Sequence, residues 1–94
     1  MVRVQDIKEG EGVVRVVDGE LIALYNNKGA IEAHSTVCTH AACDVDWNSG
    51  AKVWDCPCHG SRFAPDGAVV KGPAREPLKP LEIEITNDEI HLKR

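Results

Sequence analysis

Two short segments carry all four cysteines of this 94-residue chain: Cys38-Thr39-His40-Ala41-Ala42-Cys43 and Cys56-Pro57-Cys58-His59-Gly60-Ser61. The first offers a Cys-x-His pair and the second a Cys-x-x-His pair, and each adds one further cysteine. Thiolates and imidazoles favour zinc, copper or iron–sulfur centres over calcium and magnesium, which take oxygen ligands. A c-type haem site is excluded because the C-x-x-C-H signature is absent. The two segments therefore predict a site for a soft metal.

The chain on either side of these segments predicts an all-β scaffold. Residues 13–17 and 20–24 flank Asp18-Gly19, a dipeptide that favours the type I′ turn of a hairpin. Further strands are expected over 30–34, over 81–85 and over 89–92. The strict alternation of residues 81–85 predicts one buried and one solvated face.

The middle of the chain has a different character. Between residues 37 and 80 lie all five prolines and both tryptophans, and only 52–55 and 68–70 have the pattern of strands. Long irregular loops inside a compact domain are usually functional. We therefore expect one domain over 1–94, with a loop subdomain at about 36–74 that carries the metal site.

Composition excludes several classes of function. The net charge of −4 and a pI near 5.5 argue against nucleic-acid binding, which needs a basic surface. The longest apolar run, 21–25, is too short for a membrane span. Acidic residues from Asp6 onward fit neither a secretory signal nor a transit peptide. The chain is therefore predicted to be cytoplasmic, unless it has been separated from a targeting sequence.

The two cysteine segments, with Gly72-Pro73-Ala74 downstream, resemble the Rieske [2Fe–2S] family over essentially the whole chain. The resemblance implies an antiparallel β-sandwich or barrel with a cluster-binding loop subdomain. A narrower resemblance is to the Rieske domain that ends certain FAD-dependent oxidoreductases. It rests on Asp46-Trp47-Asn48, Trp54-Asp55-Cys56 and Gly60-Ser61-Arg62-Phe63.

By this resemblance each iron takes two ligands from the chain. Cys38 and Cys56 would bind one iron, and His40 and His59 the other, while Cys43 and Cys58 would form a disulfide between the loops. Two histidines in place of two thiolates raise the reduction potential from about −400 mV to between about −150 and +300 mV. The implied function is one-electron transfer with a redox protein or a fused flavoprotein domain. This chain alone is not expected to be catalytic.

The resemblance also implies how the potential is set. The hydroxyl of Ser61 would donate a hydrogen bond to a bridging sulfide. Phe63 stands where high-potential members have a tyrosine that donates to a ligand sulfur. Because phenylalanine has no donor, we expect a potential in the lower or middle part of the Rieske range. Gly72-Pro73-Ala74 would be either a lid that shields the cluster or an ordinary connection.

Other interpretations of the same residues stay open at this point. The ligand set could hold structural zinc, although zinc sites usually pair like ligands. The four cysteines could form two disulfides, or Cys43 and Cys58 could be two thiols. As to function, the alternatives are a redox-sensing or structural module and a trimmed Rieske subunit of a cytochrome complex. His34 and His91 are expected to be ordinary surface or strand histidines.

Overall fold

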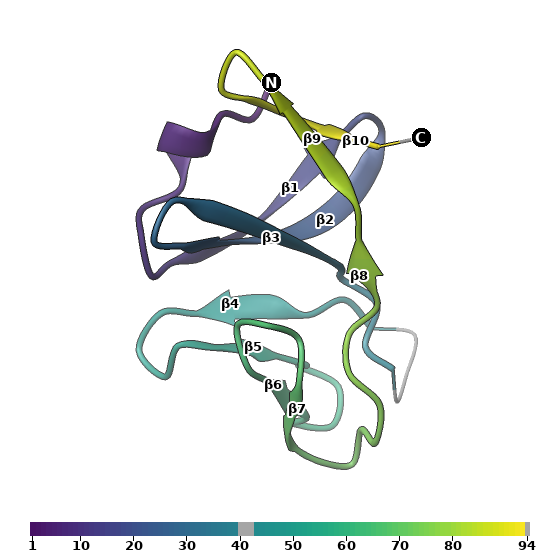
Figure 1. The fold of residues 1–94 in the computed structure, drawn as a ribbon. Coiled ribbons are helices and arrows are strands. Elements are labelled where there is room, and N and C mark those ends of the chain that lie inside the picture. The colour runs from purple at the N-terminus through teal and green to yellow at the C-terminus, as the bar shows by residue number, and fades with distance from the viewer. Residues whose placement is uncertain (40–42, 94) are drawn as a thin grey trace.

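The computed structural model describes residues 1–39 and 43–93, which form antiparallel sheets (Figure 1). The first four-stranded sheet, called the base sheet here, has the order β1 (Gly12–Val17), β2 (Glu20–Asn27), β3 (Ala30–Ser35) and β8 (Pro80–Leu81). The second, called the loop sheet, has the order β4 (Asp46–Asn48), β5 (Val53–Asp55), β6 (Arg62–Phe63) and β7 (Val69–Lys71). A hairpin of β9 (Ile83–Thr86) and β10 (Glu89–Leu92) and a 3-10 turn, η1 (Val4–Asp6), complete the described elements. The all-β prediction is confirmed.

Tight two-residue turns set the register of three hairpins. They connect Val17 with Glu20, Asn27 with Ala30 and Thr86 with Glu89. Both central residues of each turn have positive φ, 48° and 85° at Asp18-Gly19, as a type I′ turn requires. The turn predicted from Asp18-Gly19 is therefore confirmed.

The expected strand over 81–85 is the main departure from the sequence prediction. The base sheet keeps Leu81, whereas Ile83–Thr86 turns away to pair with β10. The carbonyl of Glu82, between the two strands, accepts a hydrogen bond from Lys93 N–H at 3.1 Å. The alternating face is consequently not buried throughout, since Ile85 is 47% exposed, and that expectation is wrong.

Two hydrophobic cores lie on opposite faces of the base sheet. The upper core in Figure 1 joins the sheet to η1 and the β9–β10 hairpin, and it includes Ile22, Leu24 and Ile90. The lower core joins it to the loop sheet and includes Ala23, Trp54 and Phe63. Side chains that alternate along β2 thus enter different cores. The base sheet is the shared platform on which the cysteine segments are held.

Candidate metal centre

The two cysteine segments are closed at their bases in the same way. The N–H of Cys38 donates to the carbonyl of Cys43 at 2.8 Å, and the N–H of Cys56 donates to the carbonyl of Ser61 at 2.8 Å. Each bond spans five residues, so each segment becomes a short loop that begins at a cysteine. The two segments therefore have the same closing hydrogen bond at their bases.

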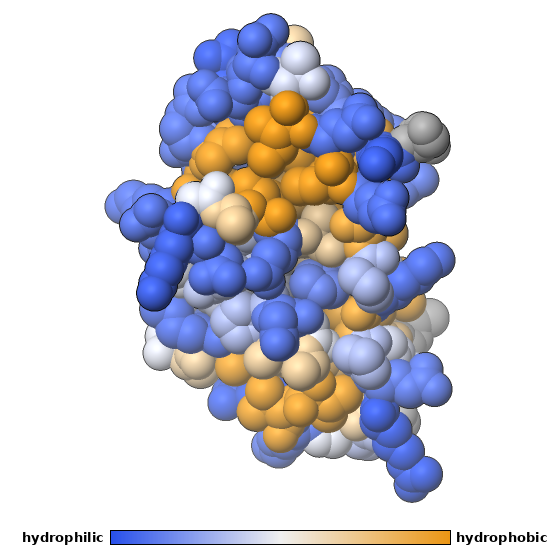
Figure 2. Space-filling model, in the orientation of Figure 1, coloured by the Kyte–Doolittle hydropathy of each residue, from blue (hydrophilic) through white to orange (hydrophobic). Residues whose placement is uncertain are grey.

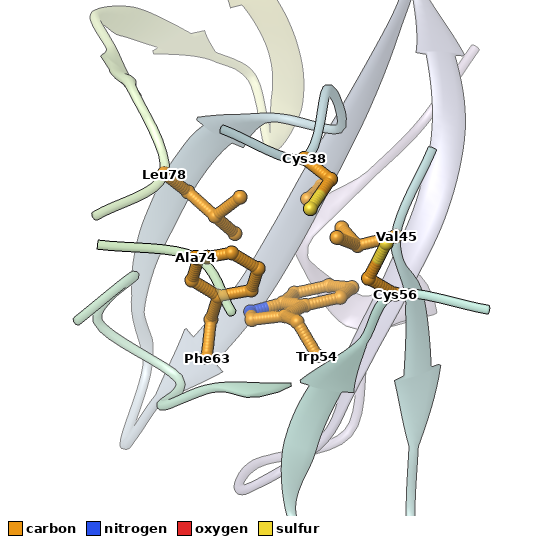
Figure 3. Close-up of a cluster of buried hydrophobic side chains, with 8 residues drawn as sticks. Cys38, Val45, Trp54, Cys56, Phe63, Ala74 and Leu78 are labelled. Atoms are coloured by element: carbon orange, nitrogen blue, oxygen red, sulfur yellow. The ribbon is translucent and has the colours of Figure 1, made fainter. Parts of the chain in front are cut away.

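Cys38 and Cys56 are both buried in the lower core (Figure 3). Their exposed fractions are 2% and 1%, and neither takes part in a disulfide. Val45, Trp54 and Phe63 pack around them. Two buried thiols from two loops, surrounded by apolar side chains, are the donors that an iron–sulfur centre shielded from water needs.

The predicted disulfide between Cys43 and Cys58 is present, with their Cα atoms 6.5 Å apart. It is a covalent link between the loop that starts at Cys38 and the loop that starts at Cys56. The two ends differ in environment, because Cys58 is exposed whereas Cys43 is half-buried and packs against the lower core.

One of the two predicted histidine ligands, His59, lies among the described residues. His59 lies in the second loop with an exposed side chain. His40 lies outside the described residues, so its assignment stays a prediction. Within 1–39 and 43–93, no three metal-binding side chains gather at one point. The predicted centre does not need three, because each of its two irons takes only two side chains of the chain.

Ser61 connects the second loop to the segment 72–74. Its side chain is 0% exposed, and its Oγ accepts a hydrogen bond from the N–H of Ala74 at 3.0 Å. That bond uses a lone pair and leaves the hydroxyl proton available for donation. The geometry therefore suits the predicted donation from Ser61 to a sulfide and shows a second task, which is to hold Ala74.

Thr39 makes the corresponding connection from the first loop, and sequence reasoning missed it. Its hydroxyl donates to the carbonyl of Glu76 at 2.7 Å. The segment around Pro73, which follows a cis Gly72-Pro73 bond, is thus tied to both cysteine loops. An open hollow of about 490 Å³ is lined by Thr39, Pro73, Arg75 and Glu76. The signal in the sequence was a polar residue between two expected ligands, but its partner is 37 positions away.

His34 is a strand histidine, which is one of the two expected alternatives, and it is buried. It lies in β3 and is 7% exposed. A Cβ added to Gly67, in the turn before β7, would lie 2.8 Å from its ring. Burial lowers the pKa of His34, against the raising effects of a hydrogen bond with the Asp66 backbone and of the charges of Glu32 and Asp66. His34 therefore packs as a neutral side chain between the base sheet and the loop sheet.

His91 lies in β10 and is partly exposed, as expected for a strand histidine. Its Nδ1 is 3.4 Å from an oxygen of Asp18, and its Nε2 is 3.5 Å from an oxygen of Glu89. These contacts are on the side of the base sheet that carries the β9–β10 hairpin, so His91 has no part in the metal centre.

Comparison with known proteins agrees with this site. Residues 1–82 match the family model of the Rieske [2Fe-2S] domain. The putative Rieske 2Fe-2S iron-sulfur protein YhfW of Bacillus subtilis is 43% identical over 84 residues, which cover 88% of this chain and 16% of YhfW. The cytochrome b6-f complex iron-sulfur subunit of Chlorobaculum tepidum is 33% identical over 85 residues, which cover 90% of this chain and 47% of that subunit.

A solved structure extends the similarity to the fold. The plasma membrane Rieske protein PetC3 from Synechocystis PCC 6803 superposes with a TM-score of 0.80 at 30% identity, and the match covers all of both chains. By contrast, the chain spans less than half the length of the two sequence relatives. The buried cysteine pair, the bridged loops and the match over most of the sequence lead to one conclusion: this chain belongs to the Rieske [2Fe–2S] domain family, whose cofactor is a [2Fe–2S] cluster and whose chemistry is electron transfer.

Proposed function

We propose that Cys38 and Cys56 bind one iron of the cluster and that His40 and His59 bind the other, so that the chain passes single electrons at its histidine side. The observation that carries this proposal is the contrast in burial within one loop: Cys56 is 1% exposed, whereas His59, three residues later, is exposed. An electron leaves most easily where a ligand reaches the surface. When bound, the cluster supplies the one-electron chemistry, and this chain supplies its burial, its ligands and its hydrogen bonds.

The ligand assignment is tested by electron paramagnetic resonance of the dithionite-reduced protein. A rhombic signal with the low average g of a histidine-ligated [2Fe–2S] cluster is expected. Replacing His59 with cysteine should move the average g towards that of an all-cysteine cluster or abolish the signal. The matched change His91→Cys, in β10, should leave the spectrum unchanged. A colourless protein that holds zinc would contradict the proposal.

We further propose that the partner is a flavin-dependent oxidoreductase, as a separate protein or as the rest of a longer polypeptide. The relationship to YhfW supports a longer polypeptide, because the matched residues make up only 16% of that protein. Phe63 adds to this support, because a missing donor near the cluster lowers the potential towards values that a flavin can reduce.

The alternative is a subunit of a cytochrome complex, and the b6-f relatives favour it. Within the described residues no helix is long and apolar enough to cross a membrane. Stopped-flow mixing of the oxidised protein with photoreduced flavin or with a short-chain quinol distinguishes the two. Faster reduction by flavin is expected, and faster reduction by quinol would favour the cytochrome complex. A cluster that neither donor reduces would indicate a structural module.

The surface beside the cluster loops suits a protein partner. Val37 and Val70 are 53% and 59% exposed and flank the first loop and the Pro73 segment in sequence. Figure 2 shows hydrophobic side chains gathered at the lower end of the molecule, where the loop sheet lies. We propose that a partner contacts this end, and that the protein works in the cytoplasm. Fractionation of cells that express the full-length protein tests that location.

A further inference from the structure

We propose that the Cys43–Cys58 disulfide is a reducible switch, opened by a protein dithiol of the Cys-x-x-Cys type through attack on the sulfur of Cys58. The two cysteines differ in exposure. Cys58 is exposed, and so are its neighbours Pro57, His59 and Gly60. Cys43 is half-buried and packs against the lower core. Because thiol–disulfide exchange depends on which sulfur an attacking thiolate can reach, the exchange should be directed to Cys58.

The exchange is balanced by the reductant itself. One thiolate of the dithiol bonds to Cys58 Sγ, the bond between Cys58 and Cys43 breaks, and Cys43 leaves as a thiolate that takes up a proton. The second thiolate of the reductant then attacks the reductant's first sulfur, which is bonded to Cys58 in the mixed disulfide, and Cys58 is released as a thiolate that takes up a proton. Two electrons pass to the chain, which gains two thiols, and the dithiol becomes a disulfide.

The structure limits what opening the bridge disturbs. Each loop keeps its own closing hydrogen bond, from Cys38 N–H to Cys43 and from Cys56 N–H to Ser61. The Pro73 segment stays tied to the loops through Thr39 and Ser61. None of these bonds uses a disulfide sulfur. Reduction should therefore leave the sheets folded while it removes the covalent link between the two ligand loops, which loosens the hold on the cluster.

The experiment starts from the cluster-loaded protein, in which electron paramagnetic resonance first verifies the cluster. It is incubated with a thioredoxin-type protein in which the resolving cysteine is replaced by serine, so that the first mixed disulfide is trapped. Peptide mapping by mass spectrometry then shows which cysteine carries the adduct. We expect the adduct on Cys58. An adduct on Cys43, or one that forms only in denaturant, would overturn the proposal.

A second measurement tests the consequence for the cluster. With the intact dithiol protein, the visible absorbance of the cluster should be lost about tenfold faster than with buffer alone, a factor equivalent to about 1.4 kcal/mol. A Cys43→Ser/Cys58→Ser double variant should lose its cluster at the fast rate whether or not the dithiol is present. Far-ultraviolet circular dichroism should be unchanged in both cases. Equal rates of cluster loss with and without the disulfide would show that the disulfide does not control how firmly the cluster is held.

The outcome is independent of the electron partner. The proposal requires only the cluster and the bridge, so it could fail while electron transfer to a flavoprotein holds. Conversely, the flavin partner could be wrong while the disulfide is reducible, since reduction of the cluster by quinol in place of flavin would not change which cysteine carries the adduct.

Discussion

We expect single side chains in the lower core to set how strongly the cluster attracts an electron. Phe63 is 0% exposed and packs in the same core as Cys38 (Figure 3). Its ring offers no hydrogen-bond donor, while Ser61 offers one. The two residues lie two positions apart, at the end of the second loop, and can be substituted separately.

Phe63→Tyr should raise the reduction potential by about 60 mV or more. A hydrogen bond to a charged acceptor contributes about 1.5 kcal/mol, and the potential of a one-electron couple changes by about 59 mV for each 1.4 kcal/mol. A potentiometric titration followed by electron paramagnetic resonance measures it. Phe63→Leu, which also lacks a donor, is the control and should not raise the potential. A folded tyrosine variant with an unchanged potential would refute the explanation.

Ser61→Ala should lower the potential and also destabilise the protein. The substitution removes the hydroxyl donor and leaves the buried N–H of Ala74 without its acceptor, which costs about 1–3 kcal/mol. Urea unfolding and the same potentiometric titration measure the two effects. Ser61→Thr, which keeps the hydroxyl, should retain most of the potential and most of the stability of the wild type. A potential that is unchanged in Ser61→Ala would count against a sulfide acceptor.

His34 makes the stability of the junction between the sheets depend on pH. Its pKa in the folded protein lies below the usual 6.5, so between these two values the unfolded chain binds more protons. Stability is therefore full above pH 6.5 and falls as the pH drops towards the folded pKa, by up to about 1.4 kcal/mol per pH unit. Urea unfolding from pH 7.5 to 5 should show a smaller loss for His34→Gln than for the wild type. His91→Gln is the control.

Candidate ligands of the cofactor could be predicted from the sequence, whereas the residues that position the ligand loops could not. Cysteine and histidine spacing carries its own chemistry, and so does the Asp18-Gly19 turn. Thr39 and His34 gave no such signal, because their roles come from Glu76 and Gly67, which only the fold brings near. The same is true of Glu11, whose carboxylate accepts hydrogen bonds from Trp47 Nε1 at 3.2 Å and Ser49 Oγ at 2.6 Å.

At the level of strands, the predictions succeeded where a strand has its own pattern. The base hairpins alternate or end in turn residues, so their existence could be predicted. β4 and β6 are three and two residues long and contain charged or polar side chains, so no local pattern marks them. They are strands because the loop sheet pairs them, with Trp47 opposite Trp54 and Trp54 opposite Phe63.

The contact between β1 and the loop sheet is close enough to test. A Cβ on Gly12 would lie 2.8 Å from Trp47 and 2.9 Å from Trp54. The two indole rings pack edge to face, with their centroids 4.9 Å apart. Gly12→Ala should therefore destabilise the protein by about 1–3 kcal/mol through overpacking. Urea unfolding measures it. The control is Gly50→Ala, where the nearest atom would be 3.5 Å away, and equal effects would contradict the close packing.

At the scale of the whole molecule, the base sheet separates two cores that depend differently on the cofactor. The upper core, with Ile22, Leu24 and Ile90, contains no cysteine. The lower core contains Cys38 and Cys56 together with Trp54 and Phe63. Removing the cluster leaves two thiols where metal bonds would otherwise join the loops, and so removes constraint from the lower core alone.

Amide hydrogen exchange of the cluster-loaded and cluster-free protein should show this division. Backbone amides of β5 and β6 should lose protection by at least about tenfold when the cluster is removed, because local opening there no longer breaks metal bonds. Amides of β9 and β10 should keep theirs, since their hairpin packs against the upper core. Uniform loss over both cores would instead mean that the cluster holds the whole domain in one cooperative unit. In that case a reductant that opens the disulfide would threaten the fold as well as the cofactor.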